Sequence, residues 1–244
     1  MDLSIFFFAA FGVAVFGIGK GGFAGPISML AVPVMSFVMN PIQAAGILLP
    51  LLVLMDVMAM YIYWKKWRVD IFKIIIPASI IGIIIGSLTF QYTSENQIRL
   101  VVGIISILFV IISLIQKNNL ALKPTKIKGI FWSGTAGYTS FLIHAGAPPM
   151  NFYMLPLKLD KTIYIGTTTF AYFIINSVKL IPYYYLDLLA PSNLKISIAL
   201  IPVAILSVLL GYFLQKKVSQ EVFYNIIYFL LFLSGLKLIY DGLF

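Results

Sequence analysis

The sequence predicts an all-α polytopic membrane protein of two inverted repeats, each a broken or re-entrant helical hairpin plus three transmembrane helices. Three observations support this prediction: an apolar composition, a series of stretches of near-membrane length, and a similarity between the two halves of the chain. Hydrophobic residues make up 61% of the 244 residues and charged residues only 10%, with a mean hydropathy of +1.02. Soluble domains are about 45 to 50% apolar and about 25% charged, which excludes a soluble globular domain.

Ten largely apolar stretches divide the chain. They cover residues 3–19, 24–39, 41–63, 74–92, 100–116, 129–143, 147–157, 162–181, 196–214 and 222–239. Several of them reach the roughly 20 residues that a transmembrane helix needs. The first two, and likewise the sixth and seventh, are shorter and are joined by glycine-rich or proline-rich elbows. We therefore expect a broken or re-entrant hairpin at both places.

Basic residues are concentrated in two loops, after the third and after the fifth stretch. They are Lys65, Lys66, Arg68 and Lys73 in the first loop, and Lys117, Lys123, Lys126 and Lys128 in the second. Lysine and arginine mark cytoplasmic loops, so both loops are expected on the cytoplasmic side of the cell membrane. In the second half, the turn that carries Lys216 and Lys217 is the better cytoplasmic candidate. This topology places both termini outside.

The two halves of the chain match at nearly fixed offsets of 120 to 125 residues. The matched pairs are Gly46 with Gly166, Asp56 with Asn176, Pro77 with Pro202, and Gly86 with Gly211. Internal repeats of this kind are common in transporters. We divide the chain into a first repeat over residues 1–116, a basic cytoplasmic linker over 117–128 and a second repeat over 129–244. Two alternatives stay open, namely parallel halves and a chance alignment of apolar helices.

The first elbow, GIGKGGFAGP over residues 17–26, is a candidate anion site formed by Gly19, Lys20, Gly21 and Gly22. Glycine lets a ligand approach the backbone, and Pro26 suits the first turn of a following helix. A helix N-terminus attracts anions through its free N–H groups, and Lys20 adds a full positive charge. The alternative is an elbow at the membrane interface whose lysine reaches the lipid headgroups.

The second elbow, HAGAPP over residues 144–149, occupies the corresponding place in the second half. Its candidate binding residues are His144, Ala145, Gly146, Pro148 and Pro149. Two elbows that enter from opposite sides bring two helix N-termini together near the membrane centre, which suits a small anion. The alternative for the histidine is a hydrogen bond to a neighbouring helix.

Three polar residues interrupt the apolar stretches at matched positions. Asp56 lies well inside the third stretch, and Asn176 and Lys179 share one face of the eighth. An intramembrane carboxylate needs a partner or a function, so an ion pair between Lys179 and Asp56 is one option and interfacial snorkelling of the lysine is another. Asp56 and His144 are the candidate proton carriers, because imidazole titrates near working pH. For the threonines at 167–169 we favour a packing role, with a hydrogen bond to substrate or to backbone as the alternative.

Several function classes are excluded by what the sequence lacks. It has no cysteine and one histidine, so a thiolate site and a multi-histidine metal site cannot form within one chain. No nucleotide-binding, zinc-protease or GxSxG motif occurs, and we expect no cofactor and no enzymatic activity. The formal charge of +9 is explained by basic loops, so we expect lipid and a small anion as partners, but no nucleic acid. A homo-oligomer stays open.

Five strings in order resemble the sulfite exporter TauE/SafE family, also called toluene sulfonate uptake permeases. They are GIGKGGFAGP, PIQAAGILLPLLVLMDV, HAGAPP, DKTIYIGTTT and NSVKLIPYY. The resemblance covers essentially the whole chain. It implies a membrane carrier for small sulfur-containing anions such as sulfite or organosulfonates, without a catalytic cofactor. It points to the elbow at 19–22, Asp56, the elbow at 144–149, Asn176 and Lys179, whereas many members have glycine in place of Lys20.

We therefore expect a secondary transporter that moves small sulfur-containing anions across the cell membrane by alternating access. Backbone N–H groups of the two elbows, together with Lys20 and Lys179, are expected to hold the substrate. One alternative is an anion channel. A weaker alternative is a membrane-embedded enzyme that uses His144 and Asp56, because one histidine and one acid form a thin catalytic set.

Overall fold

The computed structural model describes residues 3–23, 28, 31–35, 37–92, 94–115 and 124–243. These residues form helices and short connections, and no β-strand occurs among them, which confirms the all-α class. Four helices in the described part are long and apolar enough to cross a membrane: Ser4–Phe23, Ile42–Ile62, Val69–Tyr92 and Gln220–Leu243. A bent helix pair brings the number to five. The chain is therefore a multi-pass membrane protein.

The described residues of the first half form five α-helices and two short helical turns. They are α1 (Leu3–Ile18), a π-helical turn (Gly19–Phe23), α2 (Ala31–Met35), α3 (Pro41–Ile62), α4 (Val69–Thr89), a 3-10 turn (Phe90–Tyr92) and α5 (Glu95–Ile115). The start of α3 follows from its sequence: the Asn40 side chain accepts a hydrogen bond from the backbone N–H of Ile42, and proline occupies the first helical position.

The second half runs from α6 to α11. It consists of α6 (Lys126–Ile143), α7 (Ala147–Met154), a 3-10 turn (Leu155–Leu157), α8 (Lys161–Tyr185), α9 (Pro191–Ala199), α10 (Ile201–Lys216) and α11 (Gln220–Leu243). Thr125 caps α6 and Asp160 caps α8, each by accepting a backbone N–H from the first turn. The stretch expected at 196–214 falls on α9 and α10, which meet at a 51° bend where Pro202 lacks a backbone N–H.

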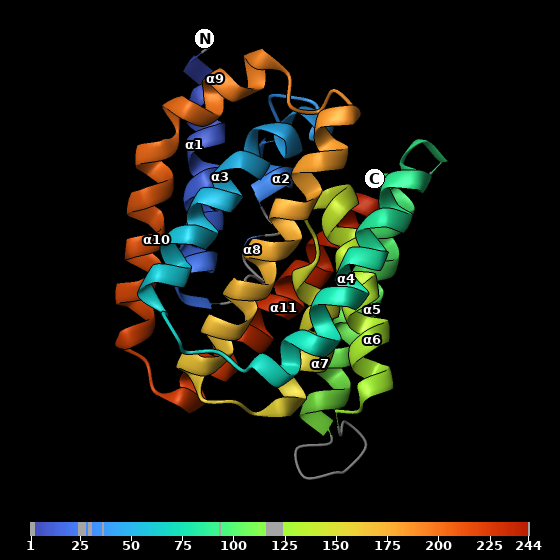
Figure 1. Cartoon of the computed structure of the whole chain (residues 1–244), viewed down its shortest axis with the longest axis vertical. Helices are drawn as coiled ribbons and strands as arrows, with labels where there is room; N and C mark the ends of the chain where they lie inside the picture. The colour runs from blue at the N-terminus through green and yellow to red at the C-terminus, as the bar shows by residue number, and fades with distance from the viewer. Residues whose placement is uncertain are drawn as a thin grey trace.

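Helix packing between the halves is reciprocal. Helix α1 packs on α10 in the second half, and α6 packs on α4 in the first half. Helices α3 and α8 pack on each other, as do α5 and α11. In Figure 1, α1 descends from the upper end of the bundle, whereas α6 ascends from the lower end. The halves are thus interleaved, and the helices that open them enter from opposite ends.

The basic loops and the termini lie at opposite ends of the bundle. The connection between α3 and α4, the start of α6 and the connection between α10 and α11 are all at the lower end of Figure 1, whereas both termini are toward the upper end. This placement agrees with the expected topology, while the side of the membrane that each end faces stays a prediction. Of the expected linker at 117–128, residues 117–123 lie outside the described residues.

The prediction that the helix breaks at the glycines of the first elbow is wrong. Helical backbone continues through Gly19–Phe23 as a π-helical turn, so these residues extend α1 and do not form a bend. A side chain at Gly21 would lie 2.0 Å from the carbonyl oxygen of Val208, and one at Gly22 would lie 2.1 Å from that of Gly211. Close packing of α1 against α10 therefore requires these glycines. Pro26 lies outside the described residues.

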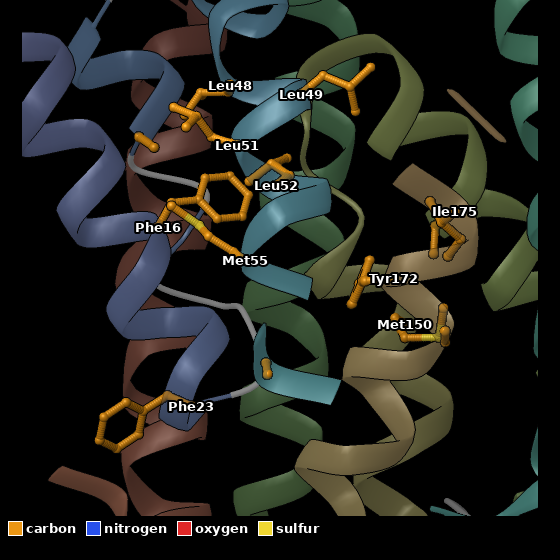
Figure 2. Packing of buried hydrophobic residues seen from close by; sticks show 14 of the residues in the cluster. Phe16, Phe23, Leu48, Leu49, Leu51, Leu52, Met55, Met150, Tyr172 and Ile175 are labelled. Carbon is orange, nitrogen blue, oxygen red and sulfur yellow. The ribbon is translucent and has the colours of Figure 1, made fainter. Parts of the chain in front are cut away.

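Two buried tyrosines tie the hairpins to the central helices in the same way. The Tyr63 hydroxyl, just after α3, donates to the carbonyl of Gly21 at 2.7 Å, and the Tyr183 hydroxyl of α8 donates to that of Phe141 at 2.8 Å. The two tyrosines are 120 residues apart, as are their two acceptors. Figure 2 shows the apolar side chains that α1, α3, α7 and α8 direct into the core around this region.

Candidate functional site

A small cavity lies among α1, α3, the hairpin of α6 and α7, and α8. Its volume is about 20 Å³, space for about one water molecule. Both halves of the chain contribute to it. The lining residues are Phe16, Lys20, Ser28, Leu52, Ser140, His144, Ala147, Thr168, Thr169, Tyr172 and Asn176.

Lys20 enters this cavity from the π-helical turn and is almost fully buried, with 6% of its surface exposed. Its Nζ donates to Oδ1 of Asp56 on α3 at 2.5 Å, and Asp56 is completely buried. The ammonium also lies 4.6 Å from the ring centroid of Tyr172, within cation–π range. The lysine reaches the interior of the bundle, so snorkelling to a headgroup is not its role here.

Asn176 connects the carboxylate to a second lysine. Its Nδ2 donates to Oδ2 of Asp56 at 2.6 Å, which joins the two residues that the repeat offset pairs. Its Oδ1 accepts from Nζ of Lys179 at 3.3 Å. The direct ion pair considered between Lys179 and Asp56 is not formed, because Lys20 occupies one oxygen of Asp56 and Asn176 the other.

His144 ends α6 and closes this network. Its backbone is left-handed, with φ of 54°, and its N–H bonds back to the carbonyl of Ser140 at 3.2 Å. The ring lies between two partners: Nε2 is 3.1 Å from the carbonyl oxygen of Ala45 on α3, and Nδ1 is 2.8 Å from Nζ of Lys179. We considered two alternatives for this histidine, a hydrogen bond to a neighbouring helix and a place in the elbow beside the site. The structure shows both.

Together these contacts form one continuous buried chain from α1 to α6. It runs from Lys20 through Asp56, Asn176 and Lys179 to His144. Two of its side chains are basic and one is acidic. In an interior of low dielectric such a cluster attracts a negatively charged solute.

The sequence-predicted site residues separate into three groups. Lys20, His144 and Asn176 line the cavity, and Asp56 and Lys179 lie directly behind them. The remaining candidates are not among the lining residues. They are Gly19, Gly21, Gly22, Ala145, Gly146, Pro148 and Pro149, and their part in substrate binding stays a prediction.

The second elbow is a true break, but it offers few backbone donors. Helix α6 ends at Ile143 and α7 begins at Ala147, with two prolines directly after it. Proline has no backbone N–H, so in the first three residues of α7 only Ala147 carries one. Pro148 and Pro149 line a separate groove beside α5. The positive charge at the site therefore comes mainly from the lysine side chains. We had expected a larger contribution from the backbone N–H groups of two helix starts.

Sequence reasoning missed Tyr172, Ser28 and Ser140. Tyr172 lies four residues before Asn176 and seven before Lys179, so all three share one face of α8. That helical spacing was the available signal. Ser140 stands 120 residues after Lys20, the offset that pairs Asp56 with Asn176, and it accepts from Lys179 at 3.2 Å.

Metal chemistry finds no support in the described part of the chain. No group of three or more histidine, cysteine, aspartate or glutamate side chains is placed there to hold a metal ion.

Comparison with known families agrees with the resemblance noted in the sequence. The family model described as sulfite exporter TauE/SafE matches residues 4–238 of the 244. Comparisons with characterised proteins and with solved structures gave no match. The matched family is one of membrane transporters, and the match includes every residue of the buried polar chain. The chain therefore belongs to the sulfite exporter TauE/SafE family.

Proposed function

We propose that this protein is a secondary transporter that moves small sulfur-containing anions, such as sulfite or organosulfonates, across the cell membrane by alternating access. The cavity beside Lys20 is the proposed binding site. The observation that carries the proposal is the burial of two lysines and one aspartate at a cavity between the two halves. Buried charges in a membrane are costly and mark substrate or ion paths.

The proposed anion site requires a donor set that faces the cavity. Among the described residues, the Lys20 ammonium donates one hydrogen bond, to Asp56, and its other two N–H groups have no partner. Ser140 and Thr169, which carry hydroxyl groups, line the same cavity. Charge-assisted hydrogen bonds from an ammonium to an oxyanion are among the stronger polar contacts in proteins.

Two inverted repeats are part of this proposal. The reciprocal packing of α1 on α10 and α6 on α4 supports them, as do the matching bonds of Tyr63 and Tyr183. In transporters built this way, the substrate sits at the interface of the repeats, and rocking of one repeat against the other exposes it to each side. The opposite entry of α1 and α6 supports inverted over parallel halves (Figure 1).

The size of the cavity favours a carrier over a channel. A space of about 20 Å³ does not admit a sulfur oxyanion with its several heavy atoms, so the helices must move for binding. A carrier makes that movement in every cycle, whereas a channel needs a continuous open path. A membrane-embedded enzyme stays the weaker alternative, because His144 and Asp56 form a thin catalytic set. Asp56 and His144 remain the proposed proton carriers.

Flux through purified protein tests this function directly. We expect proteoliposomes to take up radiolabelled sulfite or a sulfonate, and uptake to change when a pH gradient is imposed. Lys20→Ala should reduce uptake strongly, whereas Lys126→Ala, at an exposed lysine at the start of α6, should not. Absence of flux for every sulfur oxyanion contradicts the proposal, and single-molecule currents would identify a channel.

A further inference from the structure

The hydrogen-bond partners of His144 fix its charge. Its Nε2 faces the carbonyl oxygen of Ala45, which can only accept, so Nε2 carries the proton. Its Nδ1 lies 2.8 Å from the Nζ of Lys179, and Nδ1 is bare when that lysine donates to it. The imidazole in this arrangement is therefore neutral.

The partners of Lys179 match those of a charged ammonium. Its Nζ lies within hydrogen-bond distance of three acceptors: Ser140 Oγ at 3.2 Å, His144 Nδ1 at 2.8 Å and Asn176 Oδ1 at 3.3 Å. An ammonium can donate to all three groups, whereas a neutral amine would have to accept from the Ser140 hydroxyl, and we take the charged form as the premise of the inference.

Asp56 and Lys20 are the other two ionisable groups that determine the net charge of the site. Both oxygens of Asp56 accept, one from Lys20 and one from Asn176, as a carboxylate does. Lys20, Asp56, Lys179 and His144 are the ionisable acid, lysine and histidine side chains among the buried residues that the structure describes. Two positive charges and one negative charge leave the site with a net charge of +1.

One hydroxyl at the cavity has no partner. Among the described residues, four buried side-chain polar atoms lack a hydrogen bond, and of these only the Tyr172 hydroxyl belongs to a residue lining the cavity. The side chain projects from α8 into the core and is only 7% exposed (Figure 2). A buried unsatisfied hydroxyl costs free energy, so a donor kept in this state beside Lys20 points to a ligand that accepts its hydrogen bond.

We propose that this site selects singly charged sulfur oxyanions, such as methanesulfonate and hydrogen sulfite, over doubly charged ones, and that Tyr172 donates its hydroxyl to the bound anion. This inference rests on the proposed transport function. An anion of charge −1 neutralises the site, whereas a dianion leaves one negative charge unpaired in a medium of low dielectric. An unpaired buried charge is strongly unfavourable, which gives the selection its physical basis.

Charge selection is tested on the unmodified protein in proteoliposomes. Uptake of radiolabelled methanesulfonate, which is singly charged at every working pH, is measured in competition with unlabelled methanesulfonate or sulfate. We expect sulfate to compete at least about tenfold more weakly, as an uncompensated buried charge requires. The ratio of sulfite uptake to methanesulfonate uptake should also rise as the pH falls through the titration of hydrogen sulfite. Because titration of the protein affects the uptake of both anions, the ratio of the two rates removes this effect.

The Tyr172→Phe variant tests the hydroxyl without changing the ring. We expect KM for methanesulfonate to rise about tenfold or more, the loss typical of a hydrogen bond to a charged group. Elution profile and thermal stability should stay at the level of the unmodified protein, because the hydroxyl has no protein partner to lose. Tyr184→Phe, at an exposed tyrosine about three turns further along α8, is the matched control and should leave KM unchanged.

The outcomes separate this inference from the function on which it rests. Equal competition by sulfate and methanesulfonate overturns charge selection while transport stands. An unchanged KM in Tyr172→Phe overturns the role of the hydroxyl. Absence of uptake of any sulfur oxyanion overturns the transport proposal itself.

Discussion

Lys20 and Asp56 form a buried ion pair, 2.5 Å between Nζ and Oδ1, that joins the π-helical turn after α1 to the middle of α3. The pair is separated by 36 residues in the sequence and has almost no exposed surface. The carboxylate is held on its other oxygen by Asn176 from the second half. This ion pair therefore links the first hairpin to the contact between the two halves.

Removal of one member of this pair should destabilise the protein more than removal of both. Lys20→Ala leaves the Asp56 carboxylate buried without its cation, and breaking a buried pair in this way costs about 3 to 5 kcal/mol. The double variant Lys20→Ala with Asp56→Asn should recover most of that stability but not anion uptake. Thermal unfolding of the detergent-solubilised protein measures the first effect. Equal stability losses in the single and double variants would show that the loss does not come from the unpaired carboxylate of Asp56.

Lys179→Met should weaken anion binding although Lys179 is not itself one of the residues that line the cavity. The substitution keeps an unbranched side chain of similar length but removes one positive charge behind His144 and Asn176. The net charge of the site then falls to zero, and we expect the apparent affinity to fall about tenfold or more, equivalent to about 1.4 kcal/mol or more. Lys195→Met, at an exposed lysine on α9, is the control. An unchanged affinity in Lys179→Met would mean that this lysine does not contribute charge to the site.

Gly21→Ala should loosen the contact between α1 and α10. The added carbon would lie 2.0 Å from the backbone oxygen of Val208, so the two helices must separate. Forcing atoms into a well-packed interior costs about 1 to 3 kcal/mol, which should lower the unfolding temperature. Gly134→Ala on α6 is the matched control, because its added carbon would meet the nearest atom at 3.6 Å, an ordinary contact. Alanine has a higher helix propensity than glycine, so Gly134→Ala should keep or raise the unfolding temperature. Comparable losses in both variants would show that the contact with Val208 is not the cause.

The absence of cysteine makes the topology directly testable. Single cysteines at Lys126 and at Tyr92 can be labelled without background, and both positions are exposed. If the basic loops face the cytoplasm, a membrane-impermeant maleimide should label Tyr92→Cys in intact cells and Lys126→Cys only after permeabilisation. The opposite pattern would reverse the orientation, and labelling of both in intact cells would contradict the separation of these ends by a membrane.

Much of the fold follows from the sequence because lipid imposes a simple length rule. The apolar stretches at 41–63 and 222–239 correspond closely to α3 and α11, since a helix must bury about 20 residues to cross. The offset that pairs Asp56 with Asn176 also placed two residues that hydrogen-bond each other.

The rest of the site could not be predicted, because the same sequence pattern is compatible with more than one structure. Glycine is required wherever a side chain does not fit, so Gly21 and Gly22 read alike as a bend or as a helix contact, and only the position of α10 decides. The partner of Asp56 was similarly ambiguous, because two lysines were available and only the packing of α1 brings Lys20 to it. Tyr172 was overlooked because its hydroxyl matters only once a cavity is known to adjoin it.

The contact between α3 and α8 has a mechanical consequence. These helices pack on each other across the halves, and the bond between Asp56 and Asn176 ties them partway along their lengths. Under the proposed alternating access, a seesaw motion about that point would keep the bond intact while the two ends of the bundle open and close in turn. The hydrogen bond that holds the carboxylate would then also serve as the fulcrum on which the halves tilt.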